Sequence, residues 1–172
     1  SASPRGRSHP FGVRGAGDAR GEAIGALSGA RDDEGDEAAG MQMAGSAIRH
    51  DGRSASLTAP SGQAQQLVLR ASLADAQLAA EQTATLEAHG TGTALGDPIE
   101  AGAVAAVYLS ARGLRATPLA MGSLKANAGH TEPGAGLPGA LNLLVQLQSR
   151  GCSPNAHLRI INPHVGGSLA GR

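Results

Sequence analysis

Segments with helical periodicity alternate with short apolar segments along most of this chain, and this alternation is the feature that most constrains its fold. Helices are expected at residues 61–73, 97–110 and 137–150, and strands at residues 41–48, 82–89, 117–124 and 156–161. Chains in which strands and helices alternate fold as α/β proteins, in which helices cover a sheet. The sequence therefore predicts a layered α/β fold.

The first two expected helices have recognisable start signals. Ser61 has the residue type and the position of an N-cap. In the stretch "DPIE", Asp97 is expected as N-cap, Pro98 as the first helical residue and Glu100 as the third member of a capping box. The apolar face of the first helix is expected to comprise Leu67, Val68 and Ala71.

The third expected helix follows from the periodicity of its apolar residues. Leu137, Leu141, Leu144 and Val145 recur at helical spacing and are expected on one face. Gly151 is expected just after the end of this helix, at the C′ position.

The first 38 residues differ in composition from the rest of the chain. They are rich in Gly, Arg, Asp and Glu, and residues 32–37 read "DDEGDE". We expect residues 1–38 to be mostly loop or disordered, with one strand near residues 21–27, and residues 39–172 to form the folded domain.

Composition excludes several classes of function. The net charge is zero and the basic residues are scattered, so neither nucleic acid nor a membrane surface is an expected partner. No run of about 18 apolar residues is present, and the N-terminal residues lack the apolar segment of a signal peptide, so we expect an intracellular location, in the cytoplasm or a plastid. Phe11 and Tyr108 are the only aromatic residues, which predicts a core of Ala, Val, Leu and Ile.

Polar side chains follow two of the expected strands. His89 comes directly after the strand at residues 82–89, and Lys125 and His130 lie in the loop after the strand at residues 117–124. Ligand sites of open α/β sheets lie at the carboxyl ends of the strands. His89, Lys125 and His130 are therefore candidate site residues.

The glycine-rich loop after His89 lacks the spacing of known phosphate-binding loops. Gly90, Gly92 and Gly96 do not fit the dinucleotide fingerprint, and no Gly-Lys-Ser/Thr sequence follows them. These glycines also fit a tight strand-to-helix turn that carries no chemistry. The turn alone does not explain why His89 and two threonines at alternating positions accompany the glycines.

The histidines and the single cysteine raise the question of a metal site or a nucleophilic site. Zinc needs three or four ligands, whereas His89 and His130 lie on separate loops and no close pair of His or Cys residues is present. Cys152 follows a helix and has no strand-to-helix elbow or helix N-terminus after it that would activate its thiol. We expect no metal site, and Cys152 fits a small residue at the end of a helix.

Two long stretches resemble a known family. "EAHGTGTALGDPIEAGAV" (residues 87–104) and "GSLKANAGHTEPGAG" (residues 122–136) are similar to the two histidine motifs of β-ketoacyl synthases, and more closely to the ketosynthase domains of modular polyketide synthases. The similarity runs collinearly over roughly residues 18 to 165. It implies a thiolase-like fold of two similar α/β halves, of which this chain resembles the second, C-terminal half.

The resemblance also implies roles for individual residues. His89 and His130 match the two imidazoles that stabilise the thioester enolate left when a malonyl unit loses carbon dioxide. Lys125 matches a lysine that sets the electrostatics of the site and orients the second histidine. Independently of the resemblance, the proximity of Glu132 in the sequence leads us to expect that it balances the charge of Lys125. Thr91 and Thr93 match threonines that bind the phosphopantetheine arm of an acyl carrier protein.

The chain departs from the family pattern in ways that affect these expectations. The family's nucleophilic cysteine lies in an Asp-Thr-Ala-Cys-Ser-Ser type motif, and neither this motif nor the family's Gly-Thr-Asn-Ala-His ending is present. We therefore expect a domain truncated at both ends that forms no acyl-enzyme by itself. Pro133 and Pro138 replace small residues near His130, so the third helix either starts near Leu137 or is kinked.

The resemblance leads to one functional hypothesis and one alternative, and a third interpretation is a helix-layer binding module with no acyl chemistry. The chain is expected to be part of a β-ketoacyl synthase that catalyses decarboxylative Claisen condensation of an acyl thioester with malonyl-acyl carrier protein, in polyketide or fatty-acid synthesis. Its expected partners are the acyl carrier protein, the N-terminal half of the domain and a second copy in a homodimer, with no cofactor bound directly. The alternative is a non-catalytic relic or a scaffold or dimerisation fragment.

Overall fold

The computed structural model describes residues 2–4, 6–29, 41–52, 59–110, 112 and 117–169. The α-helices in these residues are α1 (Gly62–Asp75), α2 (Gly96–Val104), α3 (Lys125–Ala128), α4 (Gly136–Ser149) and α5 (Pro163–Leu169). The strands are β1 (Thr85–Glu87) and β2 (Ala120–Gly122). Short 3-10 or π-helical turns are η1 (Ala80–Gln82), η2 (Ala105–Leu109) and η3 (Glu132–Gly134).

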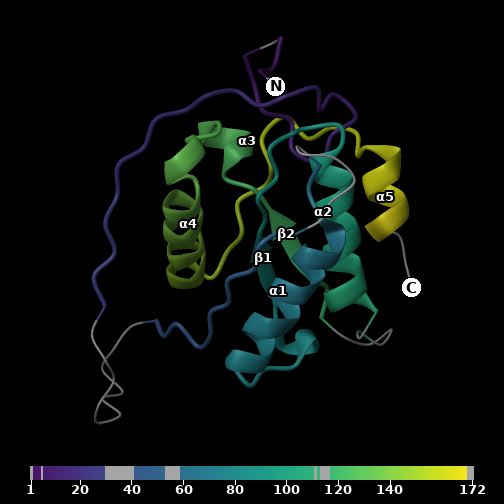
Figure 1. Ribbon diagram of the computed structural model, residues 1–172. Coiled ribbons are helices and arrows are strands. Elements are labelled where there is room, and N and C mark those ends of the chain that lie inside the picture. The colour runs from purple at the N-terminus through teal and green to yellow at the C-terminus, as the bar shows by residue number, and fades with distance from the viewer. Residues whose placement is uncertain are drawn as a thin grey trace.

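The two strands form a parallel pair between two groups of helices. Leu86 of β1 lies opposite Met121 of β2, and α2 with its π-helical continuation η2 belongs to the crossover that parallel strands require. Figure 1 shows α3 and α4 on one side of the pair, and α1, α2 and α5 on the other. The described residues therefore form the expected α/β layers around a two-stranded sheet.

The core consists of two clusters of buried side chains. The first contains Phe11, Ala88, Ala101 and Val165, and the second contains Val104, Val107 and Tyr108. Leu86 and Met121, one from each strand, pack against both clusters and join them. Both aromatic residues of the chain are thus buried among small aliphatic side chains.

The N-terminal segment forms loops that nevertheless reach the core. Its described residues, 2–4 and 6–29, contain no helix or strand, but Phe11 is only 4% exposed and belongs to the first core cluster. Isolated bridges tie this segment to the rest of the chain, including Gly12 to Ile161 and Arg20 to His130. The division of the chain at residue 38 into a loop region and a domain stays a prediction.

Three of the expected strands are wrong. Residues 21–27, 41–48 and 156–161 do not form strands, and Ile161 makes only an isolated bridge to Gly12. A strand is stable only when a neighbouring strand satisfies its backbone hydrogen bonds, and apolar character does not supply that neighbour. Helix α5, at residues 163–169, was not predicted from the sequence.

Helix α1 begins where it was expected but presents a different face to the core. The Ser61 hydroxyl accepts a hydrogen bond from the backbone N–H of Ala64 at 3.2 Å, which confirms the N-cap. Leu67 is 57% exposed, so its expected place on the apolar face is wrong, whereas Val68 and Ala71 are half-buried. Leu69 and Leu73, which the sequence did not single out, pack against the second cluster. The position of α2 beside α1 decides which of the leucines are covered.

Helix α2 has the expected extent and a different start. It runs from Gly96 and continues through η2 to Leu109, which confirms a helix ending near Ser110. The expected capping box is wrong, because the N-cap residue is Leu95 and it makes no side-chain cap. The carboxylates of Asp97 and Glu100 instead accept hydrogen bonds from other backbone segments, described below.

Helix α4 starts close to Leu137, which is the first of the two arrangements that Pro133 and Pro138 allowed. It begins at Gly136, so Pro138 lies in its first turn, where a proline costs no hydrogen bond. Arg150, rather than Gly151, takes the left-handed conformation at the helix end, with φ of 52°. Val145 is 60% exposed and does not share the buried face that its spacing predicted.

Candidate functional site

The candidate site lies where the two parallel strands end. Strand β1 leads through the buried Ala88 directly into His89, and β2 leads through Ser123 to Lys125, the first residue of α3. The backbone N–H of Ala88 donates to the carbonyl of Gly122 at 2.8 Å, which extends the pairing to the start of the site. The strand-end position predicted for these residues is therefore confirmed.

The structure brings His89 and His130 together from separate loops. Their ring centroids are 5.4 Å apart, and the rings meet edge to face at 87°. The backbone N–H of Glu132 donates to Nδ1 of His130 at 3.1 Å. Because Nδ1 is an acceptor in this contact, the proton of a neutral His130 ring is on Nε2.

His89 is held in its neutral form. Its pKa is lowered from 6.5 to about 4, chiefly by partial burial, with further contributions from the positive charge of Lys125 and from His130. A neutral imidazole carries one N–H donor and one acceptor nitrogen. Around neutral pH, the site therefore presents His89 as a hydrogen-bond donor rather than as a cation.

Two carboxylates of α2 hold the glycine-rich loop that follows His89. Glu100 accepts hydrogen bonds from the backbone N–H groups of His89 at 2.6 Å and Gly90 at 2.8 Å. Asp97 accepts from Gly92 at 3.1 Å and from Phe11 at 2.7 Å. Burial raises the pKa of both carboxyl groups, and these hydrogen bonds partly oppose that shift.

The two threonines lie beside the imidazoles. Thr91 and Thr93 have their hydroxyl oxygens 3.3 Å apart, and the Thr93 hydroxyl also accepts from the backbone N–H of Gly96. Both threonines line a cavity of about 480 Å³ together with His89. They also line a second cavity, of about 330 Å³, together with His130. The threonines thus link the surroundings of the two histidines.

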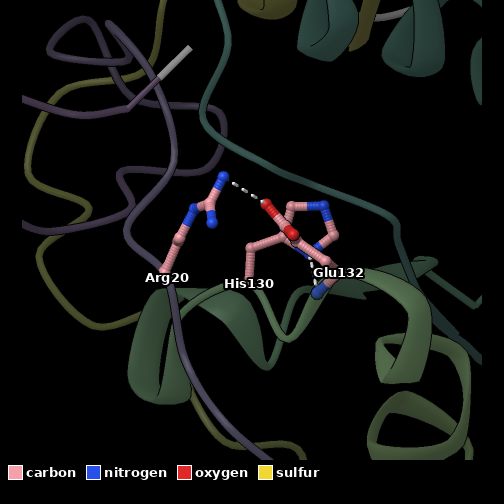
Figure 2. A network of polar contacts seen from close by, with 3 residues as sticks. All are labelled: Arg20, His130 and Glu132. Carbon is pink, nitrogen blue, oxygen red and sulfur yellow. Dashed lines mark hydrogen bonds and ion pairs between the residues drawn. The ribbon is translucent and has the colours of Figure 1, made fainter.

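Lys125 is buried, with 7% of its surface exposed. Burial lowers its pKa, and the negative charges of Glu100 and Glu87 oppose this shift. The expectation that Glu132 balances Lys125 is wrong, because the Glu132 carboxylate pairs with the guanidinium of Arg20 at 3.1 Å, as Figure 2 shows. The two acidic neighbours that act on Lys125 come from β1 and α2, which fold next to α3.

Glu87 links the residue that precedes Lys125 to helix α4. Its carboxylate accepts hydrogen bonds from the backbone N–H of Leu124 at 2.5 Å and from the side-chain amide of Asn142 on α4 at 2.8 Å. Glu87, Asp97 and Glu100 all lie inside the first histidine stretch. The sequence shows no signal for their contacts with the loop and with α3, apart from the capping pattern formed by the acids at residues 97 and 100.

No metal centre is found in the part of the chain that the structure describes, where no three His, Cys, Asp or Glu side chains are grouped closely enough to hold an ion. Cys152 is exposed, and its sulfur lies 3.3 Å from the hydroxyl of Thr85. Within the same residues, no helix has the length and apolar character needed to cross a membrane.

Comparison with known proteins assigns the family. Residues 41–159, more than half of the chain, match the family described as beta-ketoacyl synthase, C-terminal domain. The chain belongs to the β-ketoacyl synthase family. Both histidines, the lysine and the two threonines lie inside the matched residues of this C-terminal domain.

Relatives of this β-ketoacyl synthase domain include polyketide synthases. Mycoketide-CoA synthase of Mycobacterium tuberculosis is 45% identical over 123 residues, which make up 72% of this chain and 3% of that protein. The PKS-NRPS hybrid synthetase ATPKS of Aspergillus niger is 43% identical over 176 aligned residues, covering 98% of this chain and 9% of the relative. The chain therefore spans less than a tenth of the length of these curated relatives.

Solved ketosynthases share the fold of this domain. An oxazolomycin ketosynthase domain of Streptomyces albus has a TM-score of 0.67 at 32% identity, over 72% of this chain and 21% of that structure. The ketosynthase from module 6 of the bacillaene synthase of Bacillus subtilis 168 has a TM-score of 0.66 at 33% identity, over 71% of this chain and 22% of that structure. The expected thiolase-like ketosynthase fold is confirmed, and the chain covers its C-terminal part.

Proposed function

We propose that this chain acts as the C-terminal part of a β-ketoacyl synthase that condenses an acyl thioester with malonyl-acyl carrier protein, in polyketide or fatty-acid synthesis inside the cell. The family membership supports the class of reaction. The observation that carries the proposal is the meeting of two imidazoles, His89 and His130, with ring centroids 5.4 Å apart at the ends of adjacent strands.

The two histidines suit the difficult step of this reaction. When the malonyl unit loses carbon dioxide, the bonding pair of the broken C–C bond moves into the thioester group and forms an enolate. An N–H donor placed before the reaction stabilises that negative oxygen, and one such donor is typically worth about 100- to 1,000-fold in rate. His89 is neutral because of its low pKa, and His130 carries its proton on Nε2, so each ring supplies a donor.

The other candidate residues have supporting roles in this proposal. The hydroxyls of Thr91 and Thr93 bind the pantetheine arm of the carrier protein, next to the cavities that hold the two histidines. The neutral form of His89 is favoured chiefly by partial burial and additionally by the positive charge of Lys125, and the charge of Lys125 is balanced by Glu100 and Glu87.

The proposed enzyme needs further parts. An N-terminal ketosynthase half supplies the nucleophilic cysteine that carries the acyl chain, and the enolate carbon then attacks that thioester and releases the thiolate. We propose the acyl carrier protein and a second copy of the complete domain as the other partners. The isolated chain is proposed to be inactive and to bind no cofactor directly.

The proposal is tested in a polypeptide that joins this chain to an N-terminal ketosynthase half. Release of carbon dioxide from malonyl-acyl carrier protein is measured, and His89→Ala and His130→Ala are each expected to lower its rate about 100-fold or more. His164→Ala, at an exposed position of α5, is the matched control. Full activity in either site variant contradicts the assigned roles, and an inactive but folded parent protein favours the non-catalytic relic.

A further inference from the structure

The N-terminal segment binds both backbone polar groups of His130. The backbone N–H of His130 donates to the carbonyl of Ala19 at 2.6 Å, and the N–H of Gly21 donates to the carbonyl of His130 at 2.9 Å. These two hydrogen bonds place Arg20 directly beside His130 in a parallel bridge. A segment more than 100 residues away in sequence therefore fixes the position of the second histidine.

The N-terminal segment and the loop that carries His130 lie so close together that each has a glycine where they meet. A Cβ atom on Gly21 would lie 2.4 Å from the carbonyl oxygen of Ala128, and one on Gly129 would lie 2.9 Å from that of Ala19. Gly129 also has a φ of +78°, which side chains disfavour. The two backbone segments are thus in close contact, and Arg20 and His130, the residues adjacent to these glycines, lie side by side.

The residue that orients the His130 ring has an unfavourable backbone conformation. Glu132 donates its backbone N–H to Nδ1 of His130 at 3.1 Å, and it does so with a φ of +49°. Residues with a Cβ atom rarely adopt this left-handed conformation, so other contacts must hold it. Two such contacts are present: the carbonyl of Glu132 accepts a hydrogen bond from the backbone N–H of Ala135 at 3.0 Å, and the carboxylate of Glu132 lies 3.1 Å from the guanidinium of Arg20 (Figure 2).

We propose that Arg20 is a positioning residue for His130. Its ion pair with the Glu132 side chain keeps Glu132 in the conformation whose backbone N–H occupies Nδ1 of His130. The His130 proton then stays on Nε2, where it serves as a donor in the cavity that the ring shares with Thr91 and Thr93. This inference rests on the proposed function of His130.

The expected effect is modest, because both charged side chains are partly in solvent. Arg20 is 77% and Glu132 is 46% exposed, and exposed ion pairs contribute little. We expect Arg20→Ala to lower the rate constant of decarboxylation by about two- to five-fold in the joined ketosynthase, within the range that such pairs support. The KM for malonyl-acyl carrier protein is expected to stay unchanged, and Arg20→Lys is expected to restore most of the rate.

Arg14→Ala is the matched control, because Arg14 is exposed in the same N-terminal segment. An unchanged rate constant in Arg20→Ala overturns the inference. A rise in KM without a fall in the rate constant also overturns it, because that result assigns Arg20 to substrate binding.

A glycine at residue 132 separates positioning from other effects of Arg20. Glycine adopts positive φ without the steric cost of a Cβ atom, and it keeps the backbone N–H that reaches His130. In the Glu132→Gly background, Arg20→Ala is therefore expected to change the rate constant of decarboxylation by less than about 1.5-fold. A fall of the same size as in the parent background contradicts the inference.

Nitrogen-15 NMR of the histidines gives a readout that does not depend on activity. The full 172-residue chain contains six histidines, and His130→Ala identifies the signals of His130 by subtraction. We expect mainly the Nε2–H form of His130 in the parent chain and a larger share of the Nδ1–H form in Arg20→Ala. An unaltered ratio refutes the role of Arg20 even if His130 proves essential. If His130→Ala keeps full decarboxylation, the proposed function fails, while the tautomer ratio still decides the role of Arg20.

Discussion

Glu100 binds the backbone of the residue that carries the first imidazole, since its carboxylate accepts the N–H of His89 at 2.6 Å. Its other oxygen accepts the N–H of Gly90 at 2.8 Å. The backbone position of His89 is therefore fixed by a side chain on the next helix, in addition to strand β1 that precedes it.

Glu100→Gln is expected to destabilise the chain by about 1–3 kcal/mol, because the amide of Gln keeps only one acceptor oxygen and turns its NH₂ donor toward the other backbone N–H. The free energy of unfolding in urea measures this effect. Glu81→Gln, at an exposed position of η1, is the control. Equal stabilities of the two variants argue against the Glu100 contacts.

The low pKa of His89 is expected to depend on Lys125. NMR titration of the chain is expected to show His89 changing charge near pH 4, and the signal is identified by its loss in His89→Gln. Lys125→Gln is expected to raise this pKa, because the positive charge of Lys125 is one of its causes. The pKa is expected to remain below 6.5, since burial is the largest cause. A pKa that does not move in Lys125→Gln contradicts this electrostatic account.

The same pKa predicts how acid affects stability. The folded state holds His89 at about 4, whereas the ordinary value is 6.5, so the unfolded chain takes up the proton first as the pH falls. His89 therefore reduces the free energy of unfolding progressively from pH 6.5 down to about 4, and contributes nothing above that range.

Comparison with His89→Gln at each pH isolates this contribution. The raised pKa values of Asp97 and Glu100 act in the opposite direction at low pH, and they are present in both proteins. The parent chain is expected to lose more stability than the variant between pH 7 and pH 5, measured by urea unfolding. Parallel pH profiles show that His89 is not held neutral by the fold.

Gly90 is expected to tolerate no side chain. Its φ is +41°, and a Cβ atom would lie 2.7 Å from Cβ of the buried Ser123. Gly90→Ala is expected to lower the free energy of unfolding by about 1–3 kcal/mol, because it combines an unfavourable φ with a clash. Gly102→Ala, in α2, meets no atom within 4 Å and is expected to raise stability by about 0.5–1 kcal/mol. Effects of the same sign in both variants contradict this prediction.

Glu87→Gln is expected to loosen the connection between the start of α3 and helix α4. Glu87 accepts from the backbone of Leu124 and from the amide of Asn142, and Gln can serve only one of these donors. The expected loss is about 1–3 kcal/mol in the free energy of unfolding. Glu22→Gln, at an exposed position of the N-terminal segment, controls for the loss of charge. A stability equal to that of the control would show that these two hydrogen bonds contribute nothing net.

Local sequence determined the features that depend on neighbouring residues. The Ser61 cap was predictable because its hydrogen bond reaches only to Ala64, and the predicted helix end near Ser110 agrees with α2 and η2. The placement of His89 and His130 at strand ends was also predictable, because the strand that precedes each of them determines it.

Tertiary structure alone decided which partners the charged side chains have. Asp97 and Glu100 look like a cap in sequence, yet they bind the loop that packs against their helix. Glu132 pairs with Arg20 rather than with Lys125, because the N-terminal segment crosses beside His130. Caps and periodicity arise from contacts within a few residues, whereas these pairs join residues that only the packing of distant segments brings within hydrogen-bond distance.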